Sequence, residues 1–117
     1  AVRDYLHLKL VAEPNEVFAV VCRNPQHQVL AYEPMFKGTV DQTSVYPRVL
    51  VQRALALNAS AVILAHQHPS GMTVPSAADQ ALTDRLKAAL AIVDVRVVDY
   101  FIVGKGTPYS FAESGLL

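Results

Sequence analysis

Three side chains that can bind a metal ion lie close together in the sequence: His66, His68 and Asp79. The two histidines are separated by one residue and follow the largely apolar run 60–65, which is short and branched enough to form a buried strand. Because side chains alternate along a strand, both imidazoles are expected on the same face of it. Imidazole and carboxylate groups are ligands of zinc, and a catalytic zinc ion has three protein ligands and one open position. The spacing therefore predicts one zinc ion per chain.

Asp79 also lies at the start of a predicted helix, which runs from residue 77 to about residue 93. The apolar residues of this helix recur with the spacing of one buried stripe: Leu82, Leu86, Ala89, Leu90 and Val93. At about 100° per residue, Asp79 falls within the stripe, so its carboxylate is expected to face the protein interior. A charged group that faces inward needs a partner or a metal ion, because unpaired burial is costly.

Simpler roles are open for the same residues. Ser76 and Asp79 have the spacing of a capping box, in which Ser76 caps the backbone and Asp79 favours the positive end of the helix dipole. His66 and His68 can also be partly buried imidazoles with ordinary hydrogen-bond partners. The combination of a His-x-His pair with an inward-facing aspartate favours the metal site over these alternatives.

The same stretch resembles the JAMM motif, also called MPN+ or JAB, of a family of metallopeptidases. The resemblance rests on His66-x-His68-Pro69, then six residues, then Ser76-x-x-Asp79, and the run HPSG is similar to the RadC-like bacterial branch. Similar residues continue along nearly the whole chain: Glu16-Val17-Phe18, Phe36-Lys37-Gly38-Thr39, Pro47-Arg48, Asn58-Ala59, Ser110-Phe111 and Gly115-Leu116-Leu117. Gln67 departs from the expected asparagine, but that position is not a ligand.

The resemblance implies a zinc-dependent hydrolase that cleaves a peptide, isopeptide or similar amide bond in a peptide or protein substrate. It implies that His66, His68 and Asp79 are the metal ligands. It also implies that Glu16 is the general base and then the general acid, and that Ser76 donates a hydrogen bond to the oxyanion. The alternative from another class is a non-catalytic RadC-like domain that acts in DNA repair or recombination through protein or DNA contacts.

Glu16 is the first residue of a predicted strand over residues 16–23. If this strand lies antiparallel beside strand 60–66, its first residue lies next to the last residue of the other strand, which brings Glu16 near His66. Glu13 and Glu33 are open alternatives for the general base, because the sequence does not fix the register of the hairpin. The simpler role for Glu16 is a solvated carboxylate at the edge of a strand.

Length and composition set limits on the function. The 117 residues suffice for one domain, expected to span residues 1–117. Ten basic and ten acidic residues cancel without a visible basic cluster, so binding of nucleic acid by this domain is not expected. The lone Cys22 excludes an internal disulfide and suits a reducing compartment. Neither a signal-like segment nor an apolar run of about 18 residues is present, so we expect a cytoplasmic protein without membrane contact.

Apolar periodicity and turn residues predict the elements around the candidate ligands. Strands are predicted at residues 16–23, 28–36, 60–66, 95–103 and 109–112. A short helix is predicted over residues 2–11, and a second helix is predicted from Pro47 to Asn58. Pro69, Ser70 and Gly71 are expected to end the third strand and turn the chain. The predicted fold class is α/β, with a mixed, largely antiparallel sheet flanked by helices. The family resemblance implies the same architecture, the JAB/MPN fold, which is cytidine-deaminase-like.

Overall fold

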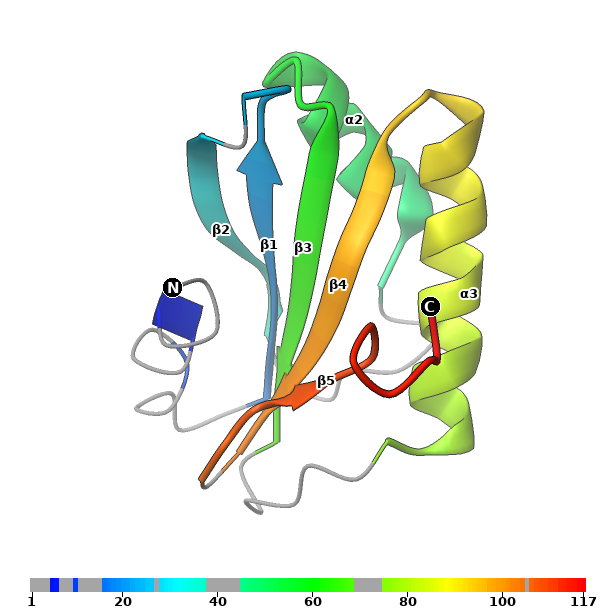
Figure 1. Ribbon diagram of the computed structural model, residues 1–117. Helices are drawn as coiled ribbons and strands as arrows, with labels where there is room; N and C mark the ends of the chain where they lie inside the picture. Colours follow the sequence, from blue (N-terminus) through cyan, green and yellow to red (C-terminus); the bar gives the residue numbers. More distant parts are fainter. Residues whose placement is uncertain are drawn as a thin grey trace.

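Seven helices and strands form the described part of the protein (Figure 1). The computed structural model describes residues 5–6, 10, 16–26, 28–37, 45–68, 75–104 and 106–117. In chain order, the elements are β1 (Val17–Arg23), β2 (Val29–Lys37), α2 (Pro47–Ala56), β3 (Ala61–Gln67), α3 (Ala77–Ile92), β4 (Arg96–Val103) and β5 (Tyr109–Ser110). Their boundaries agree with the predicted elements to within a few residues. Of the predicted helix over residues 2–11, residues 5, 6 and 10 are described, and all three are helical. The strands are rich in valine, isoleucine and aromatic residues, which fit a pleated and buried surface.

The five strands form one sheet in the order β2-β1-β3-β4-β5. β1 pairs antiparallel with both β2 and β3, and β4 pairs antiparallel with β5. The pairing of β3 with β4 is parallel, and α3 makes the connection between these two strands. The predicted mixed, largely antiparallel α/β fold is therefore confirmed.

The helices α2 and α3 cover one face of this sheet, and a separate apolar cluster covers the other face. Leu50 of α2 and Leu86 of α3 belong to the same cluster as Val62, Leu64 and other strand residues. The alternate residues of the strands face a second cluster, which contains Leu6 and Leu10. Because β3 is covered on both faces, all seven of its residues are buried.

The ends of the helices follow from local sequence. Pro47 is the first residue of α2, where its fixed φ and missing N–H are compatible with a helix start. Asn58 has a φ of 55°, which is the left-handed conformation predicted for the end of this helix. No helix among the described residues is long and apolar enough to cross a membrane.

The sheet topology brings three chain segments to one place. Val17, at the start of β1, pairs with Gln67, at the end of β3. Beside them, Gln67 pairs with Val103, at the end of β4, and the chain then passes from β3 to the first turn of α3. The start of β1, the end of β3 and the start of α3 therefore converge at one end of the sheet (Figure 1).

We predict that α3 contributes to stability mainly through its buried face. Leu86 is 0% exposed, so Leu86→Ala should lower the free energy of unfolding by about 2 to 5 kcal/mol, through lost burial and the cavity left behind. Ile92, on the same helix, is 83% exposed, and Ile92→Ala should change this free energy by less than about 0.5 kcal/mol. Urea unfolding of both variants checks the prediction. Equal losses would contradict the described packing of α3.

Candidate metal centre

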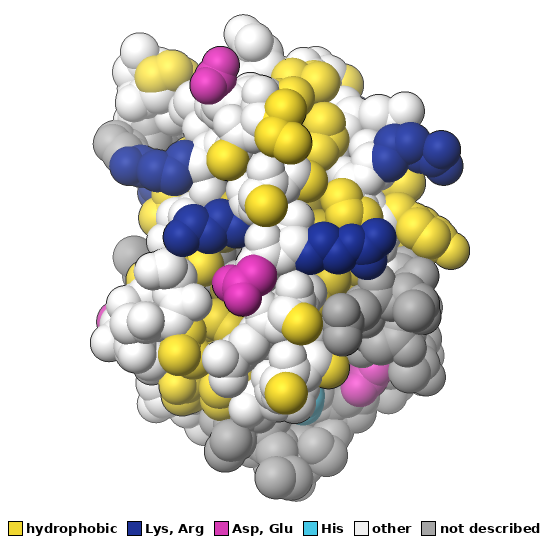
Figure 2. Space-filling view, turned by 90° about the vertical axis from the view of Figure 1, so that its right-hand side faces the viewer, with side chains coloured by type: hydrophobic (Ala, Val, Ile, Leu, Met, Phe, Trp, Pro, Cys, Tyr) yellow, Lys and Arg dark blue, Asp and Glu magenta, His cyan; other side chains and the backbone are white. Residues whose placement is uncertain are grey.

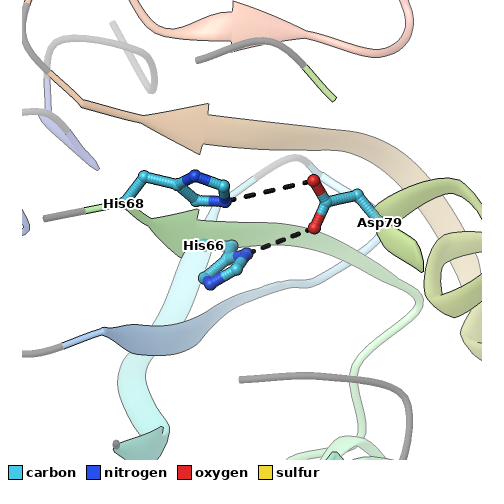
Figure 3. Close-up of side chains that lie close together, drawn as sticks. All are labelled: His66, His68 and Asp79. Carbon is cyan, nitrogen blue, oxygen red and sulfur yellow. Dashed lines mark ion pairs between the residues drawn. The ribbon is translucent and has the colours of Figure 1, made fainter. Parts of the chain in front are cut away.

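His66, His68 and Asp79 lie together at the end of the sheet where β3 ends and α3 begins (Figure 3). His66 belongs to β3, and His68 follows its last residue. The backbone N–H of His68 donates to the carbonyl of Val103 at 2.8 Å, so the strand geometry continues to His68 and both imidazoles leave the same face of β3. Pro69, Ser70 and Gly71, which were predicted to turn the chain, lie outside the described residues.

The potential ligand atoms are close enough to share one ion. One such atom from each of the three residues lies within 4.8 Å of the other two. The Nδ1 atom of His66 is 3.5 Å from Oδ1 of Asp79, and the Nε2 atom of His68 is 4.0 Å from Oδ2 of Asp79. Ligand atoms in a tetrahedral zinc site lie about 3.4 Å apart, given bonds of about 2.0 to 2.1 Å. Small side-chain adjustments are therefore enough to bring all three groups onto a common ion.

The imidazole nitrogens of this cluster have unused coordinating capacity. Both ring nitrogens of His66 and the Nε2 atom of His68 are buried, and none has a hydrogen-bond partner among the described residues. Buried polar atoms are almost always satisfied, and here two of the three nitrogens face the Asp79 carboxylate at 3.5 and 4.0 Å without a hydrogen bond, an arrangement that a shared metal ion would complete. Hydrogen-bonded core histidines, the simpler role predicted for this pair, do not match this arrangement.

Electrostatics favours the ligating protonation states. Burial acts to raise the pKa of the Asp79 carboxyl, but the imidazole of His66 and the hydrogen bonds from Ser76 outweigh it and lower this pKa to about 2. Burial and the neighbouring His66 lower the pKa of His68, against the charges of Asp79 and Glu16. Asp79 is therefore ionised and His68 neutral at neutral pH, which are the forms that bind a metal ion.

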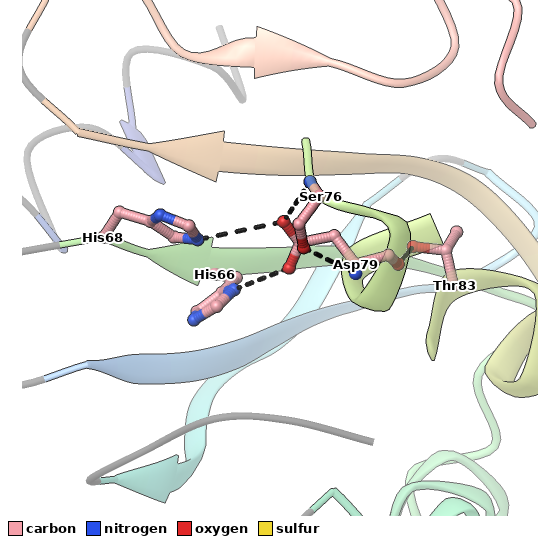
Figure 4. Close-up of polar contacts among 5 residues, drawn as sticks. All are labelled: His66, His68, Ser76, Asp79 and Thr83. Carbon is pink, nitrogen blue, oxygen red and sulfur yellow. Dashed lines mark hydrogen bonds and ion pairs between the residues drawn. The ribbon is translucent and has the colours of Figure 1, made fainter. Parts of the chain in front are cut away.

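Asp79 is at once a capping residue and a member of the cluster (Figure 4). Its Oδ2 atom accepts a hydrogen bond from the backbone N–H of Ser76 at 2.9 Å, and its own backbone N–H donates to Oγ of Ser76 at 3.0 Å. The hydroxyl of Thr83, one turn further on, donates to the carbonyl of Asp79. The two roles that the sequence left open for Asp79 are therefore compatible, because the cap uses Oδ2 while Oδ1 faces His66.

Ser76 lies beside this cluster on the solvent side. Ser76 is exposed, and its Oγ atom accepts a hydrogen bond from the backbone N–H of Asp79. A hydroxyl that accepts one hydrogen bond still has its own proton to donate. Ser76 can therefore cap the helix and donate to a ligand at the same time.

Glu16 lies next to the histidines, as the antiparallel arrangement of β1 and β3 predicts. It precedes Val17, which pairs with Gln67, so the register places Glu16 opposite His68. Glu16 is half-buried, and its charge acts on His68. Glu13, one of its two rivals for the role of general base, lies outside the described residues.

Glu33, the other alternative for the general base, pairs with a basic residue of α2. It lies in β2 opposite Val20, and both of its carboxylate oxygens accept from Nε of Arg53 in α2 at 2.7 Å. No local sequence pattern indicates this ion pair, because Glu33 and Arg53 are 20 residues apart. Burial, together with the charge of Glu33, raises the pKa of nearby Cys22 to about 11. This thiol is buried and free, so it stays protonated at neutral pH.

The helix α3 presents a mixed surface to solvent, which Figure 2 views from the right-hand side of Figure 1. Basic side chains on this face are dispersed, with acidic and apolar side chains between them. A hollow of about 330 Å³ lies at the C-terminal end of α3, away from Asp79, and is lined by Lys87, Ala91, Asp94, Val95, Arg96 and Val97. None of the three candidate ligands lines it, so this hollow is separate from the metal centre.

Comparison with known proteins identifies the family. A sequence profile described as the RadC-like JAB domain matches residues 1–116. The chain belongs to the RadC-like JAB domain family. The family resemblance predicted from the motif between His66 and Asp79 is thereby confirmed.

The RadC-like JAB domain of this chain is also similar to longer bacterial proteins. UPF0758 proteins of Methylibium petroleiphilum, Leptothrix cholodnii and Azotobacter vinelandii are 62%, 61% and 60% identical to it over 117 residues. The matched region is 100% of this chain and 53%, 53% and 52% of the respective relative. The chain therefore spans about half the length of the curated relatives it matches, and their names state no activity.

We predict that the cap contributes measurably to stability. Ser76→Ala removes the acceptor of the Asp79 N–H and should lower the free energy of unfolding by about 1 kcal/mol, the usual effect of losing an N-cap side chain. Ser76→Thr retains a capping hydroxyl and should lose less. Urea unfolding of the metal-free protein measures both. An unchanged stability in Ser76→Ala would show that Ser76 does not cap α3 in solution.

Proposed function

We propose that this RadC-like JAB domain is a zinc-dependent hydrolase that cleaves a peptide, isopeptide or similar amide bond. The proposal depends on one observation: buried imidazole nitrogens that make no hydrogen bond lie within 4.8 Å of an ionised, buried carboxylate. Structural packing alone does not explain such a group, because each orphaned buried nitrogen is costly. The lone buried thiol of Cys22 suits a reducing compartment, and we propose that the domain acts in the cytoplasm.

In this proposal, His66, His68 and Asp79 hold the zinc ion. Two neutral imidazoles and one carboxylate are a donor set that occurs in catalytic zinc sites. Zinc supplies a Lewis acid that polarises a carbonyl oxygen and makes water nucleophilic at neutral pH. His68 is the most accessible of the three, with a side chain that is 21% exposed, so a substrate approaches from its side.

Glu16 is proposed to move the proton. Amide hydrolysis requires a group that takes a proton from the attacking water and gives it to the leaving nitrogen, and a carboxylate beside the nucleophile suits both steps. The register of β1 against β3 supports Glu16 for this role, since it lies across from His68 without belonging to the cluster. The pairing of Glu33 with Arg53 argues against Glu33.

Ser76 is proposed to stabilise the developing oxyanion through its hydroxyl proton. Its position at the start of α3 adds the positive end of the helix dipole on the same side. The exposure of Ser76 supports this role, because a substrate can reach it.

A non-catalytic role in DNA repair or recombination stays a hypothesis. The balance of ten basic against ten acidic residues gives no support for direct binding of nucleic acid by this domain. A duplex-binding assay at two salt concentrations distinguishes the hypotheses. Tight, sequence-selective binding at physiological salt would favour the non-catalytic role.

We predict that the domain binds one zinc ion per chain through the three proposed ligands. His66→Ala, His68→Ala and Asp79→Ala should each lower zinc affinity, because each removes one of three protein ligands. Zinc content after dialysis against a weak chelator checks this prediction. Full occupancy in all three variants would contradict the ligand assignment.

We predict that Glu16→Gln separates metal binding from hydrolysis. The change keeps the size of the side chain but removes its basic oxygen, so zinc should remain while hydrolysis falls by roughly 10² to 10⁴ fold. A screen of peptide and isopeptide substrates provides the assay, with zinc content measured on the same samples.

Glu33→Gln is the matched control on the neighbouring strand. It disrupts the pair with Arg53, yet it should leave zinc content and hydrolysis nearly unchanged. If Glu33→Gln abolishes turnover and Glu16→Gln does not, the general base has been assigned to the wrong carboxylate.

A further inference from the structure

Tyr100 of β4 has a buried hydroxyl without a partner. The residue is 0% exposed and belongs to the apolar cluster between the sheet and the helices. Its hydroxyl makes no hydrogen bond to any described residue. A phenylalanine would fill the same space without the cost of desolvating a hydroxyl, so the hydroxyl requires an explanation.

The polar group next to Tyr100 in the chain is satisfied. The carboxylate of Asp99, the preceding residue, accepts hydrogen bonds from the backbone N–H of Tyr100, the hydroxyl of Ser110 and the backbone N–H of Ala112. This arrangement ties β4 to the chain after β5 and completes the polar contacts of Asp99. The Tyr100 hydroxyl thus differs from the Asp99 carboxylate and shares its lack of a hydrogen bond with the imidazoles of His66 and His68.

The ring of Tyr100 extends toward the metal centre. Tyr100 pairs with Leu64 on β3, whereas Phe18 pairs with His66, one step closer to the end of the sheet. The rings of Tyr100 and Phe18 nevertheless lie with centroids 6.2 Å apart, although β3 runs between their strands. The two rings therefore meet over the helix-facing side of β3, next to His66.

The charge of Asp79 reaches this hydroxyl. Burial raises the pKa of Tyr100 well above its ordinary value, and the carboxylate of Asp79 raises it further. The Oδ2 atom of Asp79 accepts a hydrogen bond from the backbone N–H of Ser76, and its Oδ1 atom lies 3.5 Å from Nδ1 of His66. A carboxylate has about four acceptor sites, so Oδ1 and Oδ2 have room for another donor beside a metal ion.

We propose that the Tyr100 hydroxyl is a positioning group of the metal centre, which donates a hydrogen bond to the Asp79 carboxylate, directly or through one ordered water. This inference rests on the proposed metal site of His66, His68 and Asp79. Donors behind a ligating carboxylate fix its orientation, and their loss typically weakens metal binding. The hydroxyl therefore supports the ligating carboxylate, although its burial without a partner lowers the stability of the metal-free protein.

Tyr100→Phe tests the proposal because it removes the hydroxyl and leaves the ring. Zinc affinity, measured by competition with a chromophoric chelator, should fall roughly 10- to 100-fold. The visible spectrum of bound Co²⁺ should also change, because it reports the geometry of the ligands. The metal-free variant should unfold at the same temperature as the wild type or at a higher one, since an unpaired buried hydroxyl is gone.

Tyr32→Phe is the matched control, because Tyr32 packs against the cluster on the opposite face of the sheet. It should leave zinc affinity and the Co²⁺ spectrum unchanged. A double-mutant cycle with Asp79→Asn separates positioning from general damage to the fold: Tyr100→Phe should have little further effect on zinc affinity once the carboxylate is gone.

Two results would overturn the positioning role while leaving the metal site intact. One is a Tyr100→Phe variant with the zinc affinity and Co²⁺ spectrum of the wild type. The other is a fully additive double-mutant cycle. If the wild-type protein itself binds no zinc, the proposed function fails first and the role of Tyr100 fails with it.

Discussion

The carboxylate of Asp79 is the group on which the site depends, because it joins the start of α3 to the end of β3. Its Oδ2 atom is held by the backbone N–H of Ser76, which fixes the orientation in which Oδ1 faces His66. A buried charge of this kind is tolerated only where hydrogen bonds and neighbouring groups stabilise it. The cap does so from the helix side and leaves the other side of the carboxylate to the histidines. Helix capping and the arrangement of the candidate ligands are therefore a single structural unit.

The register of the two central antiparallel strands is the second constraint. Val17 pairs with Gln67 and Phe18 with His66, so Glu16 comes next to the imidazoles by backbone hydrogen bonding alone. A slip of one residue would turn every side chain of β1 to the other face and remove Phe18 from the core. The burial of both faces of these strands opposes such a slip. The position of Glu16 thus depends on packing along the whole of β1.

Much of this arrangement could be predicted from the sequence, because short-range periodicity determines it. The alternation of strand side chains placed His66 and His68 on one face, and helical spacing turned Asp79 inward, as the structure has them. The preference for Glu16 over Glu33 came from the family resemblance, because periodicity shows neither the hairpin register nor the pairing of Glu33 with Arg53 of a distant helix. The sequence pattern did not single out Tyr100 as a site residue. An aromatic residue in an apolar strand looks like any other core residue until its neighbours across the sheet are known.

The outer strand β2 has features that bear on how the molecule behaves at high concentration. Pro34, which has no N–H to donate, lies within this edge strand, the place in a sheet where proline is tolerated. The pairing of β2 with β1 is also irregular, because Met35 and Leu30 each stand as an extra residue between paired positions. An edge strand that carries a proline and bulges is a poor template for strands from other molecules, so the sheet resists growing into an intermolecular aggregate along this side.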